Sequence, residues 1–415
     1  MSASSMSPRV VVTGMGVVTP IGQSVAEFWS ALQEGRCGIG PFEGADSDKL
    51  DVRIVAQVNG FNHAARLAGW QRDKSIAFSG RFCWLAAAAA DEAIKQSGIE
   101  TPFAANADRV ACIIGSAAGG QLAAEIAARD RFIAGKRAVH PMLLPRLVAS
   151  SAPAHIGIEY GVKGPTYAIC SAGASAAHAI GIGCDYIRNG LVDVAIVGGT
   201  ESTMTYSALL ACQAMHILSP DGCFPFAAKR NGTVLAEGAA VLILESDRHA
   251  GMRGARILAE LCGVGMASGA HDMINPDAEA AREAMRRALD DAKIAAGSID
   301  YINAHGAGTV RDDLEETRAV KEVFGKHAYE LGMSSTKSMH GHAIGAAPAF
   351  EAVACVKAIE AGVMPPTIGL DAADPECDLD YVPRAARKKK LNYAMSNSFA
   401  LSALNVSLVF GAAPA

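Results

Sequence analysis

Three side chains in this sequence have types and settings suited to nucleophilic and acid–base chemistry. Cys170 follows a short apolar run that predicts a strand, and it precedes an alanine-rich run that predicts a helix. His305 and His342 each lie in a glycine- or serine-rich loop after a predicted buried strand. Because loops at strand ends carry much of the chemistry of α/β proteins, we expect these side chains to meet at one site.

The predicted position of Cys170 between a strand and a helix favours its thiolate form. The free N–H groups of the following helix would lie beneath the sulfur and stabilise negative charge there. They would also serve as donors to an oxyanion, as in the strand–turn–helix elbows of other nucleophilic enzymes. The chain has ten cysteines, and most are expected in the core because free cysteine is among the most buried residue types.

The two loop histidines indicate chemistry on a carbonyl group. Two imidazole N–H groups aimed at one carbonyl oxygen would polarise a thioester and stabilise an enolate. Such groups can generate a carbanion from a β-carboxy thioester by loss of carbon dioxide. His340 and His342 could instead ligate a metal, but nothing nearby supplies further ligands, so no metal site is predicted.

Length and composition indicate a globular enzyme. The chain has 415 residues, of which 50% are hydrophobic and 19% charged, enough for a large core or two packed half-domains. A net charge of −5 argues against a nucleic-acid binder. We find no signal peptide and no apolar run long enough to cross a membrane. The cysteines lack paired spacing, so we expect reduced thiols and a cytoplasmic protein.

Continuous apolar strands alternate with helices along the chain, which predicts sheets covered on both faces. The order of elements repeats and predicts two similar α/β halves, residues 1–252 and 253–415. The predicted strands cover residues 9–18, 109–114, 166–169, 193–199 and 239–245, then 255–265, 299–305, 333–337, 393–399 and 405–410.

The motifs around these residues resemble those of elongating β-ketoacyl-acyl carrier protein synthases, in the thiolase-like superfamily. The family's nucleophile motif is matched by Ala168-Ile-Cys170-Ser-Ala-Gly173. Its two histidine motifs are matched by Asn303-Ala-His305-Gly and by Ser335-Thr-Lys337-Ser-Met-His-Gly-His342. The resemblance covers essentially the whole chain. It implies a thiolase-like fold, in which the two halves form a layered α-β-α-β-α sandwich.

The resemblance implies a decarboxylative Claisen condensation with malonyl-acyl carrier protein, giving a 3-oxoacyl-acyl carrier protein and carbon dioxide. Cys170 would hold the acyl group as a thioester, while His305 and His342 would bind the malonyl thioester carbonyl. No cofactor is expected, because phosphopantetheine arrives on the acyl carrier protein. The chain would form a homodimer, or a heterodimer with a subunit that resembles a chain-length factor.

Further roles follow from the resemblance alone. Lys337 and Glu351 match an ion pair that supports the catalytic residues, and Asp313 matches an acidic position after the His305 loop. Thr309 would line the phosphopantetheine tunnel. Ala307 stands where the family usually has threonine.

Other positions depart from the family pattern and indicate a specialised fatty-acid, polyketide or polyene pathway. His340 replaces a threonine and would add a titratable group beside the substrate. Leu401 replaces the phenylalanine that gates the acyl pocket, two residues after Phe399, and its backbone N–H would be the second oxyanion donor. The glycines beside Leu401 are also replaced, so this loop should be stiffer.

A carrier protein is acidic, so basic residues should surround the tunnel, and Arg66, Arg72 and Lys74 are weak candidates. Three alternatives stay open. One is a chain-length factor, or an active subunit that needs one, although Cys170 and both histidines disfavour an inactive partner. A coenzyme A-dependent thiolase usually has a second cysteine near its C-terminus, which this chain lacks. A Cys–His peptidase would need an orienting Asn or Asp motif.

Overall fold

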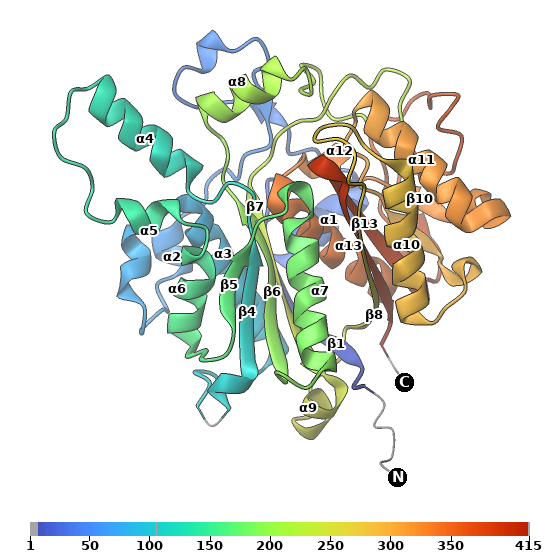
Figure 1. The fold of residues 1–415 in the computed structure, drawn as a ribbon, viewed down its shortest axis with the longest axis horizontal. Helices are drawn as coiled ribbons and strands as arrows, with labels where there is room; N and C mark the ends of the chain where they lie inside the picture. Colours follow the sequence, from blue (N-terminus) through green and yellow to red (C-terminus); the bar gives the residue numbers. More distant parts are fainter. Residues whose placement is uncertain (1–6, 105, 414–415) are drawn as a thin grey trace.

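A single mixed sheet of ten strands runs through the computed structural model, which describes residues 7–104 and 106–413 (Figure 1). In the first half, the strands are β1 (Val10–Val18), β4 (Val110–Gly115), β5 (Thr166–Ile169), β6 (Val194–Glu201) and β7 (Gly238–Ser246). In the second half, they are β8 (Ala259–Ser268), β9 (Tyr301–Asn303), β10 (Gly332–Ser334), β13 (Tyr393–Ala400) and β14 (Leu404–Ala412). Two short pairs lie apart, β2 (Gly40–Pro41) with β3 (Ile54–Val55) and β11 (Val363–Met364) with β12 (Arg387–Lys388).

The strand order shows an internal repeat. Across the sheet, the order is β10-β9-β13-β14-β8-β1-β7-β6-β4-β5. Counted along the chain within each half, both halves follow the order third, second, fourth, fifth, first. The halves join where β1 and β8 run antiparallel, through the pairs Val11 with Glu260 and Val12 with Ala259.

Helices form three layers around the two half-sheets, which confirms the α-β-α-β-α arrangement. The outer layer of the first half contains α3 (Arg81–Ser97) and α6 (Ser151–Tyr160), and that of the second half contains α10 (Ala278–Ala292) and α11 (Val310–Phe324). Between the half-sheets lie α7 (Ser175–Arg188) and α13 (Ala347–Ala361). The remaining helices are α1 (Val25–Glu34), α2 (His63–Arg66), α4 (Gln121–Phe132), α5 (Leu143–Leu147), α8 (Tyr206–Ala214), α9 (Asp247–Met252) and α12 (Lys337–His340).

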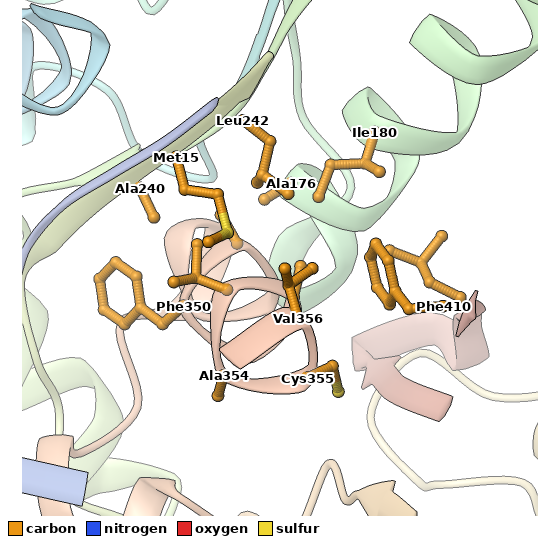
Figure 2. Packing of buried hydrophobic residues seen from close by; sticks show 14 of the residues in the cluster. Met15, Ala176, Ile180, Ala240, Leu242, Phe350, Ala354, Cys355, Val356 and Phe410 are labelled. Atoms are coloured by element: carbon orange, nitrogen blue, oxygen red, sulfur yellow. The ribbon is translucent and has the colours of Figure 1, made fainter. Parts of the chain in front are cut away.

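The main core lies in the middle layer, where the helices contact both half-sheets. Figure 2 shows Phe350 of α13 near Met15 of β1, and Ile180 of α7 on the other side with Phe410 of β14. All four side chains are fully buried. Burying a large apolar side chain stabilises the fold by about 1.5–3 kcal/mol, so this layer holds the halves together.

Glycines let each first strand approach its outer helix closely. A Cβ on Gly16 of β1 would lie 2.0 Å from the carbonyl oxygen of Ala89 on α3. A Cβ on Gly265 of β8 would lie 2.0 Å from the carbonyl oxygen of Ala284 on α10. The same close approach thus occurs in both halves, and each glycine faces an alanine-rich helix that leaves room for the backbone.

One region of the first half projects from this layered body. Helix α4 has no buried residue and lies with α5 beside the main fold (Figure 1). Phe132 is 83% exposed, Ile133 77% and Leu144 72%. Strand β5 is the edge of the sheet on the same half. The exposed apolar arm and the open strand edge are features of a surface that binds another chain.

We predict that Gly16→Ala lowers the free energy of unfolding by about 1–3 kcal/mol, since the added Cβ cannot fit against α3. Urea denaturation monitored by circular dichroism measures this change. Gly251→Ala in α9 is the matched control, because a Cβ at position 251 meets nothing within 4 Å. That control should not lower stability. Equal stability of the Gly16→Ala variant and the wild type would contradict the prediction.

Candidate active site

A cavity of about 210 Å³ lies between the middle helical layer and the loops above it. It brings together many of the residues singled out in the sequence, namely His305, Ala307, Thr309, His342, Phe399 and Leu401. Ala172 and Gly173, at the corner that precedes α7, also line it, but Cys170 does not.

The two histidines face each other inside this cavity. Their ring centroids are 5.4 Å apart and the ring planes meet at 79°. The ring of Phe399 lies 6.1 Å from that of His305 and closes one side. The Nδ1 atoms of both histidines are buried and have no hydrogen-bond partner among the described residues. A buried N–H without an acceptor is rarer than a bare acceptor, so we assign the single proton of each neutral imidazole to Nε2, from which it can be donated.

Both imidazoles are held in the neutral form. Burial holds the pKa of His305 and of His342 well below its usual range, and the nearby Lys337 cation lowers both further. A neutral imidazole can donate a hydrogen bond to a carbonyl oxygen without carrying a buried charge. The pair can therefore bind one polarised carbonyl at physiological pH.

The loop that carries His305 is shaped by a carboxylate that we did not identify from the sequence. The backbone N–H groups of His305 and Gly306 donate to Glu316 on α11, at 2.9 and 2.8 Å. Asn397 on β13 also donates to Glu316, at 3.2 Å. Glu316 lies three residues after Asp313 and so on the same helix face, a spacing that could have indicated a shared role.

Asp313 completes the support of this loop. Its carboxylate accepts hydrogen bonds from the N–H groups of Phe226, at 2.7 Å, and Gly308, at 3.0 Å. Burial raises the pKa of Asp313 to about 7, and these donors oppose the rise. Thr309 lines the cavity, but its hydroxyl caps α11 by accepting from the N–H of Asp312 at 3.1 Å. Its side chain is thus already engaged.

His342 is positioned by backbone bonds on both sides. Its N–H donates to the carbonyl of Val234 at 2.7 Å, and its carbonyl accepts from Ala236 at 3.0 Å. The preceding Gly341 has φ of 70°, in the region that favours glycine, and a Cβ there would meet Val234 O at 3.0 Å. The backbone position of His342 is therefore fixed by main-chain hydrogen bonds to Val234 and Ala236.

Lys337 links the two histidine loops. It is fully buried, donates to the carbonyl oxygen of His305 at 2.6 Å, and forms an ion pair with Glu351 of α13. Burial raises the pKa of Glu351 to about 7, and the Lys337 cation opposes that rise. Lys337 and Glu351 thus form the pair that the resemblance implied.

Two equivalent corners enclose the cavity. Ala172 (φ 48°) begins a 3₁₀ turn before α7, and Ile344 (φ 43°) begins one before α13. Both are non-glycine residues in the sparsely populated left-handed region. Each is followed by a glycine: Gly173 lines the cavity, and Gly345 packs against Ala117 and Glu201.

The expected position of Cys170 at the nucleophile corner is wrong in this structure. Strand β5 ends at Ile169, and the turn of Ala172–Ala174 lies between Cys170 and α7. Cys170 therefore precedes the cavity-facing corner by two residues. It is exposed, and its Sγ donates to the carbonyl of Ala117 at 3.4 Å. The helix N-terminus does not lie beneath its sulfur.

Gly173 takes the place expected of Cys170. A Cβ at position 173 would lie 3.6 Å from Cε1 and 3.7 Å from Nε2 of His342, and 3.6 Å from the Cβ of Ala400. These are ordinary van der Waals separations. The residue that faces the histidines across the cavity is thus a glycine.

The expectation that His340 contacts substrate is also wrong. Its side chain is fully buried outside the cavity lining, with Nδ1 at 2.8 Å from the carbonyl of Gly341 and Nε2 at 3.0 Å from the hydroxyl of Thr336. Burial lowers the pKa of His340 to about 3, so it stays neutral. It packs edge-on against Phe350 in the core.

The loop around Leu401 lines the cavity despite its lack of glycines. Leu401 is 47% exposed, and the following Ser402 and Ala403 have φ of 65° and 49°. Ser402 donates its N–H to Met273 at 2.9 Å, which holds the strained turn. Ala307 is almost fully buried at the cavity wall.

The candidate docking residues Arg66, Arg72 and Lys74 do not line the cavity. Arg66 ends α2 and donates to the carbonyl of Gln23 at 2.8 Å, while Lys74 donates to that of Trp70 at 3.0 Å. Docking by these residues stays a prediction.

Residues 7–104 and 106–413 contain neither a candidate membrane-spanning helix nor a candidate metal site. Within these ranges, no helix combines the length and apolar character needed to cross a bilayer. The same residues contain no group of three or more His, Cys, Asp or Glu side chains placed to hold a metal ion.

We predict that Lys337→Met lowers stability by about 3–5 kcal/mol, because it leaves the Glu351 carboxylate buried without its cation. Lys337→Met combined with Glu351→Leu should recover much of this loss. Chemical denaturation of the single and double variants measures both effects. Lys95→Met, in the exposed Asp91–Lys95 pair, is the control and should cost less than about 1 kcal/mol. A double variant no more stable than the single one would contradict the prediction.

Comparison with known proteins identifies the family. The beta-ketoacyl synthase N-terminal domain matches residues 7–250, and the C-terminal domain matches residues 258–371. The chain is 40% identical to nodulation protein E of Rhizobium sp. (strain N33) over 98% of this chain and 99% of that protein. It is 40% identical to 3-oxoacyl-[acyl-carrier-protein] synthase 2 of Coxiella burnetii, over 97% and 98%.

A solved structure agrees with the sequence comparisons. The ishigamide ketosynthase/chain length factor superposes with a TM-score of 0.93 at 32% identity, over 98% of this chain and 100% of that one. The chain belongs to the β-ketoacyl synthase family, acyltransferases of thiolase-like fold that perform the ketosynthase condensation of fatty-acid or polyketide synthesis.

Proposed function

We propose that this chain supplies the carbanion-forming site of a decarboxylative condensation, as one subunit of a two-chain ketosynthase in a specialised polyketide, polyene or fatty-acid pathway. The observation that carries the proposal is the pair of neutral, buried imidazoles of His305 and His342, 5.4 Å apart in one cavity. The substrate is a malonyl thioester on an acyl carrier protein.

The histidine pair acts on the thioester carbonyl. Two Nε2–H donors bind the carbonyl oxygen more strongly as it becomes an enolate oxygen, and this lowers the barrier to loss of carbon dioxide. Burial and the positive charge of Lys337 lower the pKa of both rings, so both histidines remain neutral hydrogen-bond donors. The resulting carbanion then attacks an acyl thioester and forms the new carbon–carbon bond.

Phosphopantetheine would arrive on the carrier protein and reach the cavity past Ala307 and Thr309. Arg66, Arg72 and Lys74 remain the proposed contacts for an acidic carrier protein. No other cofactor is required by this chemistry. The ten cysteines are all free thiols, which supports a cytoplasmic location.

The partner chain would have the same fold. In this chain β5 pairs with β4 alone and offers its other edge. The arm of α4 and α5 beside it exposes Phe132, Ile133 and Leu144. A second β-ketoacyl synthase chain, either a copy of this one or a related subunit, would cover both features. The similarity to a ketosynthase/chain length factor supports a heterodimer.

We predict that His305→Ala and His342→Ala each slow decarboxylation of malonyl-carrier protein by about 10²–10³-fold, because each removes one donor to the developing oxyanion. Release of carbon dioxide from carboxyl-labelled substrate measures the rate. His340→Gln is the control, since that side chain lies outside the cavity. Full activity of either alanine variant would disprove the proposed function.

We predict that Phe132→Asp with Ile133→Asp weakens dimer formation at least about tenfold, because both side chains lose their apolar contact with the partner. Analytical ultracentrifugation of the chain, alone and co-expressed with a related β-ketoacyl synthase subunit, measures this. Met252→Asp is the control, since Met252 is 71% exposed on α9, away from the arm (Figure 1). Equal weakening by the control would argue against the arm as the interface.

A further inference from the structure

The cavity has a vacant position opposite the histidines. A side chain at residue 173 would begin 3.7 Å from Nε2 of His342, at a corner formed by the strained turn that leads into α7. This is where an acyl-accepting atom would have to lie, because the carbanion forms on a substrate held by the histidines. The chain has Gly173 there, which supplies no nucleophile.

No other thiol replaces it. Cys170 is outside the cavity lining and contacts the Ala117 carbonyl. Cys212 of α8 lines the cavity, but burial raises the pKa of its thiol and so disfavours the reactive thiolate. Burial raises the pKa of Cys223, behind the His305 loop, to about 12.

The remaining groups still suffice for the first half of the reaction. Loss of carbon dioxide from a malonyl thioester breaks the bond between the carboxylate and the CH₂ carbon, and the electron pair forms the enolate that the histidines stabilise. If no electrophile is present, the enolate carbon takes a proton from water and gives an acetyl thioester. If an acyl thioester is present, the carbon attacks its carbonyl and expels the thiolate that carried it.

We infer that Gly173 leaves the acyl-accepting position of this chain vacant, so that the chain decarboxylates malonyl thioesters but never carries the growing acyl group. The acyl electrophile is a thioester held on a separate chain, either a partner synthase or a carrier protein. This inference rests on the proposed function, and it names the partner as a thioester donor.

The structure also indicates that the vacancy can be filled. The three nearest atoms to a Cβ at position 173 are 3.6–3.7 Å away, and the φ angle of Gly173 is not in the region that only glycine adopts easily. A side chain can therefore begin at this position without displacing its neighbours, and Gly173 lines the cavity into which a sulfur would extend. The thiol would lie beside a neutral imidazole, in the cavity that binds the second substrate.

The test uses the full chain with malonyl-pantetheine and hexanoyl-pantetheine as probes, followed by intact mass and peptide mapping. The wild type should release carbon dioxide, form acetyl-pantetheine and gain no acyl group. Gly173→Cys should gain one hexanoyl group that maps to residue 173. Gly173→Ser is the matched control of nearly equal size, and Cys170→Ser should behave as wild type.

The outcomes separate the inference from the proposed function. A hexanoyl group on Cys170 or Cys212 of the wild type would overturn the inference, as would a Gly173→Cys variant that is not acylated, and neither result touches decarboxylation. A wild type that releases no carbon dioxide, while Gly173→Cys is acylated, would instead overturn the proposed function. The assignment of residue 173 as the acyl-accepting position would still stand.

Discussion

The buried carboxylate of Glu201 fixes the relation between the two halves of the molecule at the cavity. It ends β6, and it accepts hydrogen bonds from the N–H groups of Ala117, at 2.8 Å, and Gly345, at 3.1 Å. The first donor belongs to the loop that follows β4, and the second belongs to the second corner. Burial raises the pKa of Glu201 to about 7, and the N–H donors oppose this.

This contact allows only a glycine at the second corner. A Cβ on Gly345 would lie 2.8 Å from Oε2 of Glu201 and 2.5 Å from the N–H of Ala117. Without the carboxylate, the backbone N–H groups of Ala117 and Gly345 would lose their acceptor, at a cost of about 1–3 kcal/mol each. Glu201 therefore fixes the second corner, which begins two residues after His342, whereas the His305 loop is held by Glu316 and Asp313.

Much of the fold could be predicted because its signals are local. Several strands with continuous apolar residues, such as the run before Gly115, lie within about two residues of their predicted positions, whereas the strand predicted at 255–265 is Ala259–Ser268. The histidine loops were found for the same reason, since each directly follows such a strand. Lys337 and Glu351 were paired only through resemblance, because their ion pair depends on how α12 packs against α13.

The nucleophile position could not be read from residue types alone. A strand, a cysteine and an alanine-rich helix suggested that the corner was at Cys170. The 3₁₀ turn of Ala172–Ala174, with a positive φ at an alanine, moved the corner past it. Nothing local in the sequence signals that turn, because alanine rarely adopts this conformation and the surrounding packing imposes it. His340 was misjudged for a similar reason, since its burial depends on Phe350.

The glycine at position 173 also changes how the protein responds to small molecules. Electrophilic inhibitors that alkylate a cavity cysteine would find only the half-buried Cys212 thiol there, whose raised pKa disfavours the reactive thiolate. The exposed thiols of Cys37 and Cys170 lie outside that lining. Compounds that imitate the malonyl group and hydrogen-bond to His305 and His342 would keep their binding site. In a mixture of ketosynthases, this chain would therefore remain unlabelled at its cavity while still competing for reversible ligands.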